Sequence, residues 1–123
     1  DTVRNAVNGK GLNRKETAKL TKARNKKLIQ LLGNPQSDKY KLLAPFYFSQ
    51  MGKEYRKIFE CDAYADVEAG RLQEAVEFFN NFTISVEYND WCLSTLHKNY
   101  QDGEIESMKK LNAYRRYFGL MVA

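Results

Sequence analysis

The residues best placed to do chemistry are four lysines near the N-terminus, spaced three or four positions apart. On a helix that turns 100° per residue, such spacing brings the side chains within about 60° of one another. A row of ammonium groups repels itself. It suits a phosphate backbone, because Lys and Arg replace the counterions that the phosphates hold. The spacing therefore predicts a polyanion-binding lysine stripe, made of Lys15, Lys19, Lys22 and Lys26.

The main alternative for the lysine stripe is that only water solvates it. The net charge of +5 is concentrated, since residues 1–33 hold nine Lys and Arg against two acids, a balance of +7. Residues 34–123 hold eleven against thirteen, a balance of −2. Because so few acids are interleaved with the lysines, we favour a partner over solvent. A membrane surface is a weaker alternative, since the opposite helix face lacks the Trp and Phe of an interfacial helix.

Other basic side chains extend the candidate polyanion-binding surface. Arg14 directly precedes the lysine stripe. A second basic cluster lies in the last apolar-periodic segment and consists of Lys109, Lys110, Arg115 and Arg116. Nearby Glu104 and Glu106 leave ordinary surface pairing open as an equal alternative for this cluster.

Patterns typical of catalysis or metal binding do not occur in the sequence. His97 is the single histidine, and it has no HExxH or metal-ligand partner at a useful spacing. There is no GxSxG, no Gly-rich phosphate loop and no clear nucleophile with a base. We therefore expect a protein that is not an enzyme and that has no cofactor, no metal and no small-molecule substrate.

The aromatic and cysteine side chains mainly indicate a packed interior. The chain holds 7 Phe, 8 Tyr and 1 Trp, and most Phe fall at helical core spacing. Tyr114 and Tyr117 are the rings we expect both to pack and to stack on bases. Cys61 and Cys92 form no CxxC motif and fit small, buried, reduced side chains. No apolar run approaches the roughly 20 residues of a membrane helix, so we expect a cytoplasmic protein without a membrane partner.

The periodicity of apolar residues predicts the fold class. Apolar positions recur at intervals of three and four throughout, which indicates an all-α compact bundle of about five to six helices with no sheet. We expect a single helical domain over residues 1–123. We expect it to be trimmed at both ends, because the chain starts at Asp1 without an initiator methionine and stops at Ala123 within an apolar helical pattern that has no cap. The first long helix should begin after a capping box of Asn13 and Glu16 and end at Gly33.

Proline, glycine and polar residues predict the remaining boundaries. Pro45 should separate a short helix that starts at Asp38 from a longer one that begins at the proline. The longer helix should run towards Val67, with Gly70 as its cap. Later helices are expected over residues 71–80, from a cap at Thr83 or Ser85 to residue 101, and over residues 108–122. A short extended stretch is left open at 82–86.

Several short segments resemble a known family. Ala65-Asp66-Val67-Glu68-Ala69-Gly70-Arg71, then Ala75-Val76-Glu77-Phe78-Phe79, and the ending from Arg116 to Ala123 are similar to the small helical subunit of type III CRISPR effector complexes. The resemblance implies a five-helix bundle that stacks along a ribonucleoprotein filament and supports the guide RNA and its target without cutting either. It adds Arg71 and Arg116 to the RNA-contacting residues. It also implies that the partners are RNA, through the guide or target backbone, and other subunits of the complex.

Three functions remain open on these grounds. The first is a non-catalytic accessory subunit that binds an RNA backbone. The alternative is a helical protein-interaction module, such as a phage or plasmid factor that docks on a host complex through an exposed aromatic residue or the acidic residues 60–68. DNA binding by a helix-turn-helix is less attractive, because no recognition helix is evident. The residues predicted to bind nucleic acid are Arg14, Lys15, Lys19, Lys22, Lys26, Arg71, Arg115 and Arg116.

Overall fold

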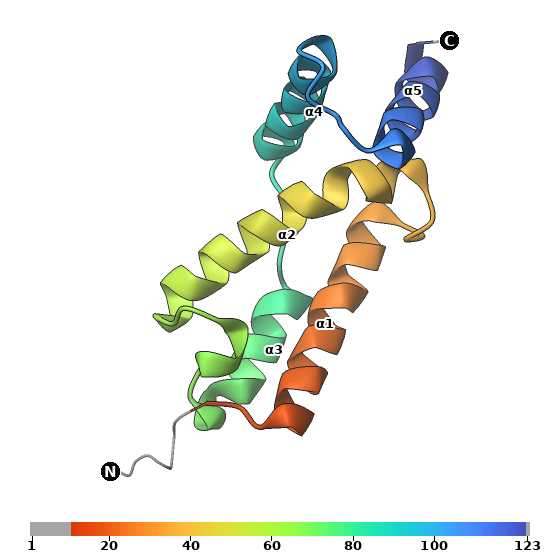
Figure 1. Cartoon of the computed structure of the whole chain (residues 1–123). Coiled ribbons are helices and arrows are strands. Elements are labelled where there is room, and N and C mark those ends of the chain that lie inside the picture. The colour runs from red at the N-terminus through yellow and green to blue at the C-terminus, as the bar shows by residue number, and fades with distance from the viewer. Residues whose placement is uncertain (1–10, 123) are drawn as a thin grey trace. The chain divides into compact units, whose positions relative to one another are not determined.

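The protein is built from helices throughout the residues that its computed structural model describes, which are 11–122, with side chains for 11–119. The helices are α1 (Arg14–Leu32), α2 (Asp38–Phe59), α3 (Leu72–Asn80), α4 (Val86–Gln101) and α5 (Met108–Val122). Two 3₁₀ turns, η1 (Tyr64–Asp66) and η2 (Ala69–Arg71), lie between α2 and α3 (Figure 1). No strand occurs in this part of the chain, so the predicted all-α class is confirmed.

Backbone contacts divide the chain into two compact units. Unit 1 holds the residues up to Lys27 together with Ser49–Phe82, and unit 2 holds Leu28–Phe48 together with the residues from Thr83 onward. Because the division falls inside α1 and α2, each of these helices contributes residues to both units. The expectation of a single domain stays a prediction.

The core of unit 1 is centred on Tyr55 of α2. Its ring stacks on Phe79 of α3, with centroids 5.6 Å apart and planes at 14°, and meets Tyr64 of η1 edge-on at 4.7 Å. The Tyr55 hydroxyl donates to the Tyr64 carbonyl at 2.9 Å. Burial raises the pKa of the Tyr55 phenol well above its ordinary value. One neutral, hydrogen-bonded ring thus joins α2, η1 and α3.

The start of α1 confirms the predicted capping box. Asn13 Oδ1 accepts from the Glu16 amide at 2.8 Å, and Glu16 Oε1 accepts from the Asn13 amide at 3.0 Å. Just before it, the Leu12 amide donates to the Ala65 carbonyl at 2.8 Å. A Cβ added to Gly11 would lie 2.6 Å from that carbonyl oxygen. Only glycine therefore allows the chain to pass so close to η1.

Two other predicted boundaries are also confirmed. Gly33 adopts a left-handed φ of 87° and ends α1. Ser85 caps α4, since its Oγ accepts from the Tyr88 amide at 3.0 Å. Both signals are local in the sequence, which explains why they could be predicted.

The predicted break at Pro45 is wrong, because α2 runs uninterrupted from Asp38 to Phe59 with the proline inside. A proline in a helix interior costs about 3 kcal/mol. Burial of a single Leu or Met side chain contributes about 1.5–3 kcal/mol, so packing on both sides of the proline outweighs its cost. The buried residues around it are Leu42, Leu43, Ala44, Tyr47 and Met51.

The same helix ends earlier than the predicted Val67. It stops at Phe59, because Glu60 has a left-handed φ of 52° and the Cys61 amide donates to the Arg56 carbonyl at 3.3 Å. This six-residue cap usually has glycine at the left-handed position, so the sequence carries no signal for a stop at a glutamate. Cys61 is consequently half-buried rather than buried, with a free thiol.

In unit 2, two hydrogen bonds between residues far apart in the sequence join α2 to α4. The Tyr47 hydroxyl donates to Asn89 Oδ1 at 2.7 Å, and the Tyr88 hydroxyl donates to the Phe46 carbonyl at 2.9 Å. The partners lie 42 positions apart in each case. These bonds fix how α4 presents its side chains beside α2. The buried residues of α4 and α5 are Cys92, Leu96, Ala113, Tyr114 and Phe118.

Candidate functional site

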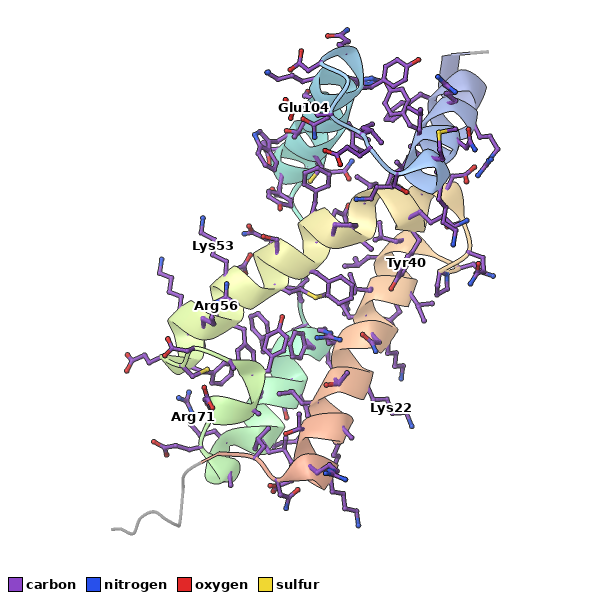
Figure 2. All side chains as sticks on the ribbon, in the orientation of Figure 1. Lys22, Tyr40, Lys53, Arg56, Arg71 and Glu104 are labelled. Atoms are coloured by element: carbon purple, nitrogen blue, oxygen red, sulfur yellow. The ribbon has the colours of Figure 1, made fainter. Side chains whose placement is uncertain are left out.

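The lysine stripe lies on the solvent-facing side of α1. All four lysines are exposed, whereas Leu20 on the opposite side is buried, and Figure 2 shows Lys22 extending away from the helix. Glu16, the only acid of α1, turns its carboxylate to the Asn13 amide. Within residues 11–119 the four ammonium groups form no ion pair. The stripe is therefore an open row of positive charge.

Two further predicted basic residues lie in unit 1, and only one of them is already engaged by neighbouring side chains. Arg14 is exposed at the first position of α1 and extends the charge of the stripe. The guanidinium of Arg71 (Figure 2) lies over the Phe59 ring, 4.7 Å from its centroid, and pairs with Glu74 at 3.1 Å. Its hydrogen bond with Glu74 raises the pKa of Arg71. Packing and pairing thus already engage Arg71.

The two predicted C-terminal arginines lie on α5 in unit 2. Arg116 holds Asp38 with two prongs, Nη2 to Oδ1 at 2.8 Å and Nε to Oδ2 at 3.1 Å. This bond lowers the pKa of Asp38 and raises that of Arg116. Arg115 is exposed and lines a shallow hollow with Leu111. Of the eight predicted residues, the structure places the five of α1 together on one helix.

Tyr114 belongs to the core, so the prediction that it stacks on bases is wrong. It is 8% exposed, and its ring stacks on Tyr100 with centroids 4.3 Å apart and packs against Phe118 at 4.5 Å. Its hydroxyl lies 2.6 Å from Nδ1 of His97. Neighbouring side chains thus occupy the ring that a base would need.

An aromatic patch that the apolar spacing did not single out lies in unit 2 and consists of Phe46, Tyr88 and Trp91. Trp91, the only tryptophan of the chain, is 54% exposed. It stacks on Tyr88, with centroids 5.6 Å apart and planes at 27°, and meets Phe46 edge-on at 5.8 Å. The hydrogen bond from Tyr88 to Phe46 holds the two supporting residues together. The sequence did contain one signal for the exposure of Trp91. Consecutive residues of a helix point about 100° apart, so Trp91 points away from its neighbour Cys92, which was expected to be buried.

Unit 2 has two neighbouring hollows beside α2. The first has a volume of about 460 Å³. The second, of about 300 Å³, shares Pro45, Ser107 and Lys110 with the first and includes Phe46 of the aromatic patch. The first hollow is lined by Pro35, Tyr40, Lys41, Ala44, Pro45, Phe48, Ser107, Lys109 and Lys110.

The described side chains include no group of three or more His, Cys, Asp or Glu placed to hold a metal ion. None of the helices that the structure describes is long and apolar enough to cross a bilayer. The features that stand out in this part of the chain are a row of ammonium groups, an aromatic patch and a hollow lined by apolar residues and lysines.

A comparison with protein families corrects the resemblance to the CRISPR subunit. The family model of the ORF6C domain matches residues 1–91, which include the segments 65–71 and 75–79 that carried the resemblance, and no CRISPR-related family matches. Short segments of this kind recur in unrelated bundles, because helix ends require the same few residue types. No curated relative and no solved structure matches the chain. The matched stretch spans most of the 123 residues, and the chain therefore belongs to the ORF6C domain family, which is found in phage and mobile-element proteins.

Proposed function

We propose that the chain is a helical protein-interaction module of a phage or mobile-element protein, and that its aromatic patch docks on a protein of the host cytoplasm. The observation that carries this proposal is the half-exposed Trp91, held between Tyr88 and Phe46. Membership of a family found in phage and mobile-element proteins supports it. The proposal involves no catalytic step and no cofactor.

The energetics of the aromatic patch favour such a role. Tryptophan is among the residues that most often dominate interface affinity, and its truncation there costs about 2 kcal/mol or more. Because its neighbours already restrict the ring of Trp91, little side-chain entropy remains to be lost on docking. A loss of about 2 kcal/mol corresponds to roughly 30-fold in Kd.

The proposal is tested by capture on the immobilised chain from nuclease-treated lysate of a host cell. A protein partner should remain bound after nuclease treatment and should be lost with Trp91→Ala. The matched control is Ile58→Ala, which removes an apolar side chain that is 52% exposed in unit 1 and should leave capture unchanged. Equal capture by wild type and Trp91→Ala, or capture that nuclease abolishes, contradicts the proposal.

The lysine stripe favours a second candidate function, binding of a nucleic-acid backbone without base specificity. Four phosphate contacts predict that log K falls against log salt with a slope of about −3 on single-stranded RNA. Lys19→Glu/Lys22→Glu should weaken retention more than Lys109→Glu/Lys110→Glu, because only the first pair lies in the stripe. Unchanged retention in the first double variant removes this candidate.

A further inference from the structure

The first hollow combines an apolar floor with a cationic rim. Tyr40, Ala44 and Pro45 of α2 form much of the floor (Figure 2 labels Tyr40), and the rim carries the ammonium groups of Lys109 and Lys110 from α5 and of Lys41. In the described part of the chain, no Asp or Glu lines this hollow. Its volume of about 460 Å³ falls within the range of about 300–1,000 Å³ that is usual for ligand pockets.

The three lysines of the first hollow are not held by carboxylates of the described residues. None of them forms an ion pair within residues 11–119. Asp38, the acid of α2 whose charge acts on Lys41, is already held by Arg116 at 2.8 Å. Glu104 and Glu106 line the second hollow, which Lys110 also lines, and neither of them lines the first hollow. The N-terminus of α5 lies at the same rim, since Ser107 caps the helix by accepting from the Lys110 amide at 3.3 Å. The helix dipole therefore adds to the positive potential.

We propose that the first hollow binds an acidic peptide segment of the partner protein, with an apolar side chain seated in the hollow and flanking carboxylates on Lys41, Lys109 and Lys110. This inference rests on the proposed function and adds the chemistry of the partner. A peptide fits better than a nucleotide, because a base requires hydrogen-bond partners along its edge. The floor offers it chiefly hydrocarbon and aromatic surface.

The probe is a displayed library of random 12-residue peptides, selected on the full chain. The selected peptides should share an aromatic or aliphatic residue flanked by Asp or Glu. Their fluorescently labelled synthetic copies should bind Lys109→Glu/Lys110→Glu at least tenfold more weakly in an anisotropy titration. Lys53→Glu/Lys57→Glu changes the charge equally at exposed positions of α2 in unit 1, and should bind within twofold of wild type. Circular dichroism verifies that each variant keeps its helices.

Three results overturn the inference: no selected peptides, peptides without acidic residues, or equal binding to both double variants. Backbone amide shifts on peptide addition provide a second measurement. Changes at residues 40–48 and 107–110 support the inference, and changes confined to other residues overturn it. Displacement of the peptide from the hollow by single-stranded RNA also overturns it, in favour of a nucleotide.

The outcome is separable from that of the proposed function. A captured partner that is lost with Trp91→Ala but retained with Lys109→Glu/Lys110→Glu upholds the docking function and overturns the acidic segment. If the captured partner is lost with Trp91→Ala and also with Lys109→Glu/Lys110→Glu, the result supports both the docking function and the acidic segment. Retention with Trp91→Ala overturns the docking function, whereas the peptide titration still reports on the hollow.

Discussion

Arg116 and Asp38, 78 positions apart in the sequence, form a two-pronged ion pair that joins the start of α2 to α5 within unit 2. The guanidinium was predicted to contact nucleic acid, yet its charge is already matched by a carboxylate of its own chain. We therefore expect the stability of unit 2 to depend on pH.

Asp38→Asn should remove an acid-sensitive part of the stability. Because Arg116 lowers the pKa of Asp38 in the folded state, the pair stabilises the fold above the unfolded pKa of about 3.9. It stops doing so as pH falls through the lowered folded value. Urea unfolding should therefore show wild type more stable than Asp38→Asn at neutral pH and the difference shrinking below about pH 4. Asp62→Asn, at an exposed acid, is the control. A difference between wild type and Asp38→Asn that does not vary with pH contradicts the prediction.

Gly11→Ala should destabilise unit 1, because the added Cβ would lie 2.6 Å from the Ala65 carbonyl oxygen. Since a backbone atom cannot yield as a side chain does, we expect a loss of about 1–3 kcal/mol in the free energy of unfolding, typical of overpacking. Gly70→Ala is the matched control, since its Cβ would meet nothing within 4 Å. Equal stability of the two variants in urea would show that the contact at Gly11 is not close.

Pro45→Ala should raise the stability, because α2 continues through this position. Alanine restores a donor for the Lys41 carbonyl and removes the clash of the proline ring, and we expect a gain of about 1–2 kcal/mol after the unfolded-state effect is subtracted. A helix that began at Pro45 would instead lose stability on this change. Thermal unfolding followed by circular dichroism decides between the two arrangements.

Lys19→Glu should stabilise α1 while weakening polyanion binding. Lys19 faces Lys15 and Lys22 at helical spacings of four and three, and each like-charge pair of this kind costs about 0.2–0.5 kcal/mol. The change turns both repulsions into attractions, while the favourable pair with Glu16, three residues earlier, becomes a repulsion. Two pairs gained against one lost leave a small net stabilisation. The midpoint of unfolding at low salt should therefore rise, and RNA retention should fall. A lower midpoint would show that the stripe is not an independent exposed row.

The features that could be predicted are those with a local physical cause. Asn13 and Ser85 cap helices through side chains that reach the next turn. Residue types and spacing predicted Asn13, and they narrowed the second cap to Thr83 or Ser85, of which the structure shows Ser85. The continuation of α2 through Pro45 and its end before Glu60 could not be predicted from residue types and spacing. Packing of side chains around the proline outweighs its cost, and a cap formed at a glutamate leaves no glycine to mark it.

The candidate sites likewise divide into those that one helix determines and those that tertiary contacts determine. The lysine stripe follows from spacing on one helix, and the structure shows its lysines exposed. The aromatic patch combines residues of α2 and α4, and the first hollow combines residues of α2 and α5. The ion pair of Arg116 with Asp38 joins the two chain segments that make up unit 2. Relations of this kind depend on tertiary contacts, which the spacing within one helix does not contain.

Pro45 also influences what the first hollow can recognise. Having no N–H, it leaves the Lys41 carbonyl without the donor that a helix normally supplies from four residues further on, and both residues line the hollow. An acceptor that is covered without a partner costs about 1–3 kcal/mol. A main-chain amide of a bound peptide would supply the missing donor wherever it reached this carbonyl, which an apolar side chain alone cannot do.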